Sequence, residues 1–150
     1  MRPEDELPAF GNVHYRLHML NERTILTMGA KGALDGRRIL VVEDEGRIVL
    51  MIQNLLAGAG ATVVGPAATA ADALALLAVE PVDGAILDYK LADGTSLPVA
   101  DALSARNVPF VFASGYDPNS IDRRYTKAPK LTRVVDAAEL LALAVAVLTR

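Results

Sequence analysis

The chain has 150 residues, a formal net charge of −3, no cysteine, 52% apolar residues and 22% charged residues. This composition predicts one folded domain and excludes disulfides, thiolate zinc sites and cysteine nucleophiles, as is typical of a cytoplasmic protein. The negative charge argues against direct binding to nucleic acid, and the longest apolar stretch is too short to span a bilayer, so we expect no membrane anchor.

Residues 37–150 alternate short apolar runs with segments of helical spacing, whereas residues 1–36 form an N-terminal extension to which the pattern assigns no structure. The expected strands are residues 39–42, 61–64, 85–87, 110–113 and 131–135. Five helices are expected. The first carries Ile48 to Leu56, the second opens at Thr69 with a capping box, and the third passes through Ala100 to Ala105. The fourth begins at Asp117-Pro118, and the fifth carries Leu140 to Leu148. The alternation predicts an α/β domain with a five-stranded, doubly wound parallel sheet in the common order 2-1-3-4-5.

The last of these helices is apolar around most of its circumference, with leucine or valine at six positions. A helix on the surface of a sheet buries only one stripe of its side chains. We therefore expect part of this helix to meet a partner protein.

Carboxylates follow two strands that are neighbours in this order. Glu43 and Asp44 come directly after the first strand, and Asp88 comes directly after the third. Ligands bind outside the carboxyl ends of the strands in such sheets, so the three side chains should converge there. Three like charges repel unless a hard cation neutralises them, which predicts a Mg²⁺ site with Asp88 as a nucleophile toward phosphorus. A lone Glu43-Asp44-Glu45 triplet would favour a plain helix N-terminus, but the second acidic position at Asp88 favours a site.

Three segments, Ile39 to Glu45, Ala85 to Asp88 and Phe112 to Tyr116, resemble the signature segments of the CheY-like receiver domains of bacterial response regulators. The last segment is similar to the Phe-Ala-Thr-Gly motif of a group of single-domain alphaproteobacterial regulators that are often paired with kinases of the HWE class. The resemblance covers residues 37–150 and implies that Glu43, Asp44, Asp88 and the backbone carbonyl of Lys90 hold Mg²⁺. It also implies that Asp88 is phosphorylated and that the Ser114 hydroxyl bonds the phosphoryl oxygens.

One departure from the family stands before the last helix, where a Lys-Pro-Phe sequence is expected and Arg133-Val134-Val135 is found. Arg133 keeps the positive charge, but its planar fork is larger and less adaptable than an ammonium, so we expect the contact with a phosphoryl group to be altered or lost. Many receivers carry a switch aromatic three residues earlier, where this chain has Lys130. Tyr116 is the candidate replacement, and a packing role for its ring is equally open.

The resemblance implies a cytoplasmic response regulator that assists its own phosphorylation and dephosphorylation without being a turnover enzyme. Its expected partners are a histidine kinase or phosphotransfer protein, and a downstream protein that reads the face formed by the fourth helix, fifth strand and fifth helix. A homodimer stays open as well. The altered position 133 leaves one alternative, a degenerate receiver that acts as a phosphorylation-independent interaction module. A remote alternative is an aspartyl phosphatase, which would need an acid at position 90, where Lys90 stands.

Overall fold

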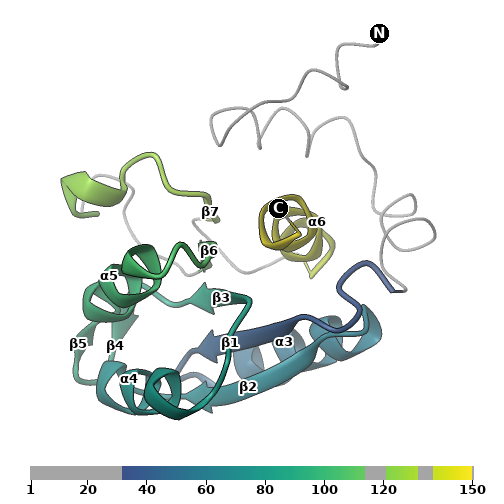
Figure 1. The fold of residues 1–150 in the computed structure, drawn as a ribbon, viewed down its shortest axis with the longest axis horizontal. Coiled ribbons are helices and arrows are strands. Elements are labelled where there is room, and N and C mark those ends of the chain that lie inside the picture. Colours follow the sequence, from purple (N-terminus) through teal and green to yellow (C-terminus); the bar gives the residue numbers. More distant parts are fainter. Residues whose placement is uncertain (1–31, 114–120, 132–136, 150) are drawn as a thin grey trace, which may run out of the picture.

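A computed structural model describes residues 32–113, 121–131 and 137–149. Its main feature is a parallel sheet of five strands in the order β2-β1-β3-β6-β7 (Figure 1). These strands are β1 (Arg38–Val42), β2 (Thr62–Ala67), β3 (Gly84–Leu87), β6 (Phe110–Ala113) and β7 (Lys130–Leu131). Two further strands, β4 (Lys90–Leu91) and β5 (Gly94–Thr95), pair only with each other, in an antiparallel hairpin after β3. When only the five strands of the parallel sheet are numbered along the chain, their order is 2-1-3-4-5, so the predicted fold class is confirmed.

Helices cover both faces of this sheet (Figure 1). They are α3 (Gly46–Gly58), α4 (Ala70–Val79), α5 (Leu97–Ala105) and α6 (Ala137–Leu148). Successive side chains of a strand point to opposite faces, so a strand buried on both sides is apolar at every position. In β1, Ile39 and Val41 pack in one core layer with α3 and α6, and Leu40 and Val42 pack in the other with α4 and α5. The continuous apolar runs in the sequence are the result of this double burial.

The N-terminus of α4 is capped twice. Thr69 Oγ1 accepts a hydrogen bond from the Asp72 backbone N–H at 3.1 Å, as the predicted capping box requires. Asp93, at the turn between β4 and β5, accepts from the N–H groups of Ala70 at 3.1 Å and Ala71 at 3.3 Å. The hairpin that follows β3 is thereby fastened to the start of α4.

The helix predicted from Asp117-Pro118 is largely absent from the part of the chain that the structure describes. The only helical element within residues 121–131 is one 3₁₀ turn, η5 (Arg123–Tyr125), and residues 117–120 lie outside the described ranges. Lys130 Nζ donates to the carbonyl of Tyr125, the last residue of this turn, and to the carbonyls of Thr126 and Ala128 that follow it. Pro129 then follows, and a proline lacks the N–H that a longer helix would need. The prediction of a helix there is wrong for the described residues.

The last helix is buried more completely than the sequence predicted. Its buried residues are Ala138, Leu140, Leu141, Ala142, Leu143, Ala144, Val147 and Leu148. The helix packs against β3, β6 and α3, and Glu139 is the one exposed residue between residues 137 and 149. The expectation of a free apolar face on this helix is therefore corrected, because most of its apolar side chains belong to the core. The fifth strand predicted over residues 131–135 begins at Lys130, and residues 132–135 lie outside the described ranges.

The described chain joins the core before β1. Leu34 is fully buried, its N–H donates to the Ala59 carbonyl at 2.9 Å, and the Gly36 N–H donates to the Gly60 carbonyl at 3.4 Å. These contacts tie the segment before β1 to the end of α3. The division between an extension and a domain at residue 37 stays a prediction.

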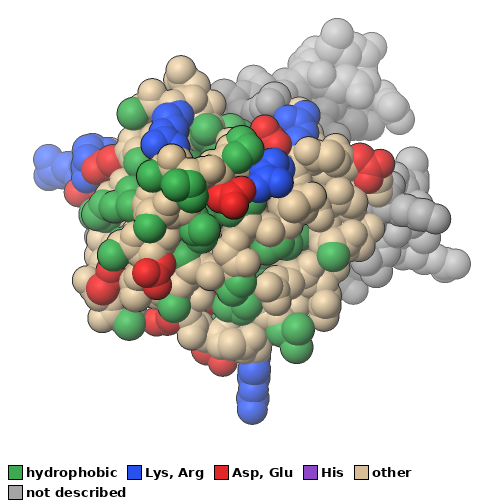
Figure 2. All heavy atoms as spheres, turned by 60° about the horizontal axis from the view of Figure 1, so that its bottom comes forward, with side chains coloured by type: hydrophobic (Ala, Val, Ile, Leu, Met, Phe, Trp, Pro, Cys, Tyr) green, Lys and Arg blue, Asp and Glu red, His purple; other side chains and the backbone are tan. Residues whose placement is uncertain are grey.

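The surface in Figure 2 carries acidic and basic side chains interspersed among apolar ones. On this face the described Lys and Arg side chains do not form one continuous basic patch. Within the described ranges, the structure contains no helix of the length and apolar character needed to cross a membrane.

Candidate functional site

The carboxyl ends of β1 and β3 lie side by side, because Val42 pairs with Leu87 in the parallel register. Two backbone hydrogen bonds fix the residues that follow. The Glu43 N–H donates to the Ala67 carbonyl at the end of β2 at 2.9 Å, and the Asp88 N–H donates to the Val42 carbonyl at 2.8 Å. The sheet thus determines where the acidic side chains begin, as the sequence pattern predicted.

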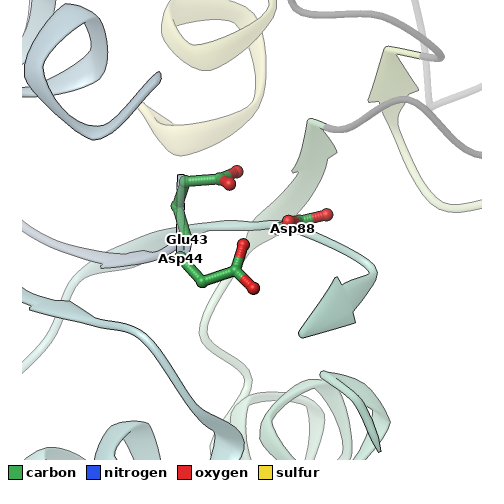
Figure 3. Close-up of side chains that lie close together, drawn as sticks. All are labelled: Glu43, Asp44 and Asp88. Carbon is green, nitrogen blue, oxygen red and sulfur yellow. The ribbon is translucent and has the colours of Figure 1, made fainter. Parts of the chain in front are cut away.

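Three carboxylates gather at this edge (Figure 3). One oxygen each from Glu43, Asp44 and Asp88 can be chosen so that all three lie within 4.8 Å of one another. Glu43 is buried, Asp88 is intermediate and Asp44 is exposed. This gradient leaves one side of the cluster open to solvent, from which a ligand can enter.

Burial and the neighbouring carboxylates raise the pKa of Glu43. Burial raises the pKa of its carboxyl group from 4.5 to about 8, and the charges of Asp88 and Asp44 and a hydrogen bond with Asp88 act in the same direction. A hydrogen bond from the Glu45 N–H to Glu43 Oε1, at 3.1 Å, only partly opposes this rise. Without a cation, Glu43 therefore holds a proton at neutral pH.

The structure divides the acidic triplet after β1 into two roles. Glu45 is the N-cap of α3, because its carboxylate accepts hydrogen bonds from the N–H groups of Arg47 at 3.3 Å and Ile48 at 3.2 Å. Glu43 and Asp44 make no such cap and turn toward Asp88 instead (Figure 3). The plain interpretation as a helix N-terminus thus applies to Glu45 alone.

Of the remaining predicted site residues, only Lys90 lies within the described part of the chain. Lys90 begins β4, two residues after Asp88, with an exposed side chain, and the role of its backbone carbonyl as a metal ligand stays a prediction. Ser114, Tyr116 and Arg133 lie outside the described residues. Their predicted contacts with a phosphoryl group are therefore not addressed by the structure.

Sequence reasoning missed Tyr89, the residue after Asp88. Its ring meets Phe112 edge to face at a centroid distance of 5.6 Å, and its hydroxyl accepts a hydrogen bond from the Asp122 N–H at 3.1 Å. The side chain is 5% exposed. A tyrosine next to a predicted nucleophile was the available signal, but its partner at position 122 could not be found from local pattern.

Comparison with known proteins agrees with this fold. No family model matches the chain. A CheY-like response regulator receiver domain protein from Methanospirillum hungatei JF-1 is 28% identical over 70% of this chain and 87% of that chain, with a TM-score of 0.61. SdrG from Sphingomonas melonis Fr1 is 41% identical over 79% of this chain and 98% of that chain, with a TM-score of 0.65. The chain belongs to the receiver-domain family of response regulators.

One curated relative of this receiver is longer than the chain itself. The phyllosphere-induced regulator PhyR from Methylorubrum extorquens is 37% identical over 81 residues, which make up 52% of this chain and 30% of PhyR. The receiver therefore matches less than a third of that protein's length. The resemblance inferred from the three sequence segments is confirmed at the level of the family.

Proposed function

We propose that this receiver accepts a phosphoryl group on Asp88 in the presence of Mg²⁺ and signals by changing its contacts with other proteins. One observation carries the proposal, the approach of Glu43, Asp44 and Asp88 oxygens to within 4.8 Å at the carboxyl edge of the sheet. The donor set fits a hard divalent cation, which prefers a few carboxylate oxygens together with waters and phosphate oxygens. The raised pKa of Glu43 supports the same conclusion, since a cation would relieve the charge that its proton now relieves.

The chemistry proposed for Asp88 is an in-line displacement. A carboxylate oxygen of Asp88 forms a bond to phosphorus while the bond from phosphorus to a phosphohistidine nitrogen breaks, and the released imidazole takes a proton from water. A bound Mg²⁺ would neutralise charge on the transferring oxygens. Asp44, which is exposed, and Asp88, which is half-buried, leave the donor an open approach, whereas Glu43 closes the inner side.

Named relatives support the choice of partners. A receiver fold is found in the complex of histidine kinase ThkA with response regulator TrrA, and TrrA is 23% identical to this chain, with a TM-score of 0.53. SdrG has been solved in a BeF3-activated conformation and is 39% identical over 98% of its chain in that structure. By analogy we propose a histidine kinase or a phosphotransfer protein as the phosphodonor, and a protein as the downstream target. From the resemblance of Phe112 to Tyr116 to the Phe-Ala-Thr-Gly motif, we propose that the kinase is of the HWE class and that the receiver acts in the cytoplasm.

The direct test is the incorporation of one phosphoryl group from a small acyl phosphate in the presence of Mg²⁺. Intact mass should show the adduct in the wild type and in Asp72→Asn, a control that alters an exposed carboxylate on α4. It should be absent in Asp88→Asn and in wild type with excess chelator. An adduct of equal yield in Asp88→Asn would contradict the proposal.

A second candidate function is favoured by Arg133, which stands where the family resemblance implies lysine. If this change abolishes switching, the receiver is a phosphorylation-independent interaction module. Amide shifts on adding beryllofluoride should separate the two functions when wild type is compared with Arg133→Lys. A response that is larger in Arg133→Lys supports a weakened switch, and the lack of any response in both proteins, with Asp88 demonstrably loaded, supports the constitutive module.

A further inference from the structure

Tyr89 is held at three points immediately beside the proposed phosphoacceptor. Its backbone carbonyl accepts from the Ser96 N–H at 2.9 Å, its ring packs edge-on against Phe112, and its hydroxyl accepts from the Asp122 N–H at 3.1 Å. Tyr89 and Asp88 are adjacent in the chain and joined by one rigid peptide plane. A displacement of the Asp88 backbone must therefore move a side chain that is fixed at its far end to another segment.

That segment is η5. Asp122 is its N-cap, and Oδ1 of Asp122 accepts from the Arg124 backbone N–H at 2.9 Å and from Arg124 Nε at 3.1 Å. Arg124 Nη1 in turn donates to Asp101 Oδ1 of α5 at 2.8 Å. The hydroxyl of Tyr125 donates to the same Asp101 oxygen at 2.6 Å. A continuous series of hydrogen bonds thus runs from Tyr89 through η5 to α5.

The position of this series on the molecule matters for signalling. Tyr89 is 5% exposed, whereas Arg123 and Arg124 of η5 are exposed. One end of the series is buried beside the carboxylate cluster and the other end is at the surface. Packed interiors move between discrete arrangements instead of deforming continuously, so such a link can carry a local change outward.

We propose that Tyr89 is a positioning residue that transmits the state of Asp88 to η5 through the hydrogen bond between its hydroxyl and the Asp122 N–H. This inference rests on the proposed function of Asp88. If Tyr89 only filled the core, its ring alone would provide the packing, and removing its hydroxyl would not change how η5 responds to Asp88. The two roles differ in one atom, which the substitution Tyr89→Phe removes while the ring stays.

The experiment compares wild type, Tyr89→Phe and Tyr125→Phe, each labelled with ¹⁵N, with Mg²⁺ alone and with Mg²⁺ and beryllofluoride. Tyr125→Phe is the matched control, because it also removes one tyrosine hydroxyl that is bonded to this network but keeps the Tyr89 contact. The Asp88 amide reports loading of the site, and the Asp122 and Arg124 amides report transmission. We expect loading in all three proteins, with the Asp122 response reduced about threefold or more in Tyr89→Phe alone.

The outcomes separate the inference from the function on which it rests. An unchanged Asp88 amide in wild type would overturn the proposed function and the inference with it. Loading at Asp88 with equal Asp122 responses in wild type and Tyr89→Phe would overturn only the role of Tyr89. A reduced Asp122 response in Tyr89→Phe and Tyr125→Phe alike would also overturn it, because the effect would then follow from loosening η5 in general.

Discussion

One carboxyl oxygen of Glu43 and one of Asp88 lie within 4.8 Å of each other at the ends of neighbouring strands. Two ionised carboxylates this close repel each other, so a proton on one of them relieves the repulsion. Glu43 is 3% exposed and has a pKa of about 8, so it holds the proton when no metal is bound. The proton and a cation are thus alternative ways to neutralise the same cluster, and several measurable consequences follow from their competition.

The metal-free protein should lose stability as the pH rises from about 5 to about 9. The pKa of Glu43 is about 8 in the folded protein, above the ordinary value of 4.5 that applies in the unfolded chain. The folded state therefore binds more protons than the unfolded state over this pH interval. Its contribution to stability is fully present below pH 4.5 and is lost as the pH rises through 8. We expect a loss on the order of 3 kcal/mol in urea unfolding with a chelator present.

Glu43→Gln provides the control for this pH dependence. The amide cannot ionise, so its free energy of unfolding should vary less between pH 5 and pH 9 than that of wild type. Saturating Mg²⁺ should also flatten the wild-type profile, because the cation stabilises the ionised cluster. Parallel profiles for wild type and Glu43→Gln would show that another group causes the dependence.

Binding of Mg²⁺ should release a proton near neutral pH. Glu43 must ionise to act as a ligand, so the dissociation constant should fall as the pH rises toward 8, by at most about tenfold per pH unit. Calorimetry in two buffers with different ionisation enthalpies measures the number of protons released. Equal heats in both buffers at pH 7 would contradict a protonated Glu43.

Asp44→Ala should abolish this binding and stabilise the metal-free fold slightly. The substitution removes an exposed member of the cluster, and with it both a ligand oxygen and a charge that helps to raise the pKa of Glu43. Thermal melting with a chelator should therefore occur at a slightly higher temperature than in wild type. A lower melting temperature would count against the repulsion argument.

The elements and the acidic cluster could be predicted from sequence where the cause is local. The β1 run from Ile39 to Val42 is apolar at every position because it is buried on both faces, and Glu43 follows it without a break. The convergence with Asp88 then follows from the strand order alone. Both features depend only on residues that are adjacent in the sequence and on the order of the strands.

Contacts between distant positions could not be predicted in this way. Asp93 caps α4 from 22 and 23 residues away, and Tyr89 bonds Asp122 from 33 residues away. Lys130 Nζ likewise reaches back along the chain, to the carbonyl of Tyr125 at the end of η5 and to those of Thr126 and Ala128. The burial of α6 was missed because a helix apolar on all sides is compatible with both a partner face and a deep core.

Asp93→Ala should destabilise the protein by about 1 kcal/mol, the usual cost of losing a helix N-cap. The N–H groups of Ala70 and Ala71 lose their partner, and the β4–β5 hairpin loses its attachment to α4. Thr69→Ala is the matched control, since it removes the other cap of the same helix and leaves the hairpin attached. Both should melt lower, but only Asp93→Ala should shift the amides of residues 88–91. Identical shifts in both variants would mean that the attachment of the hairpin does not position the loop after β3.

The last prediction concerns Asp101, which accepts hydrogen bonds from Tyr125 and Arg124. The bond from the Tyr125 hydroxyl, followed by that from Arg124, holds the pKa of Asp101 below its ordinary 3.8. Because the folded pKa is depressed, the contribution to stability is present at neutral pH and is lost as the pH falls through the folded pKa. The carboxylate is largely solvated, so we expect only a small change in the free energy of unfolding.

Carboxyl ¹³C titration should show the pKa of Asp101 rising toward 3.8 in Tyr125→Phe and staying low in Tyr89→Phe. An equal rise in both variants would mean that η5 as a whole, and not the Tyr125 hydroxyl, sets the protonation of Asp101.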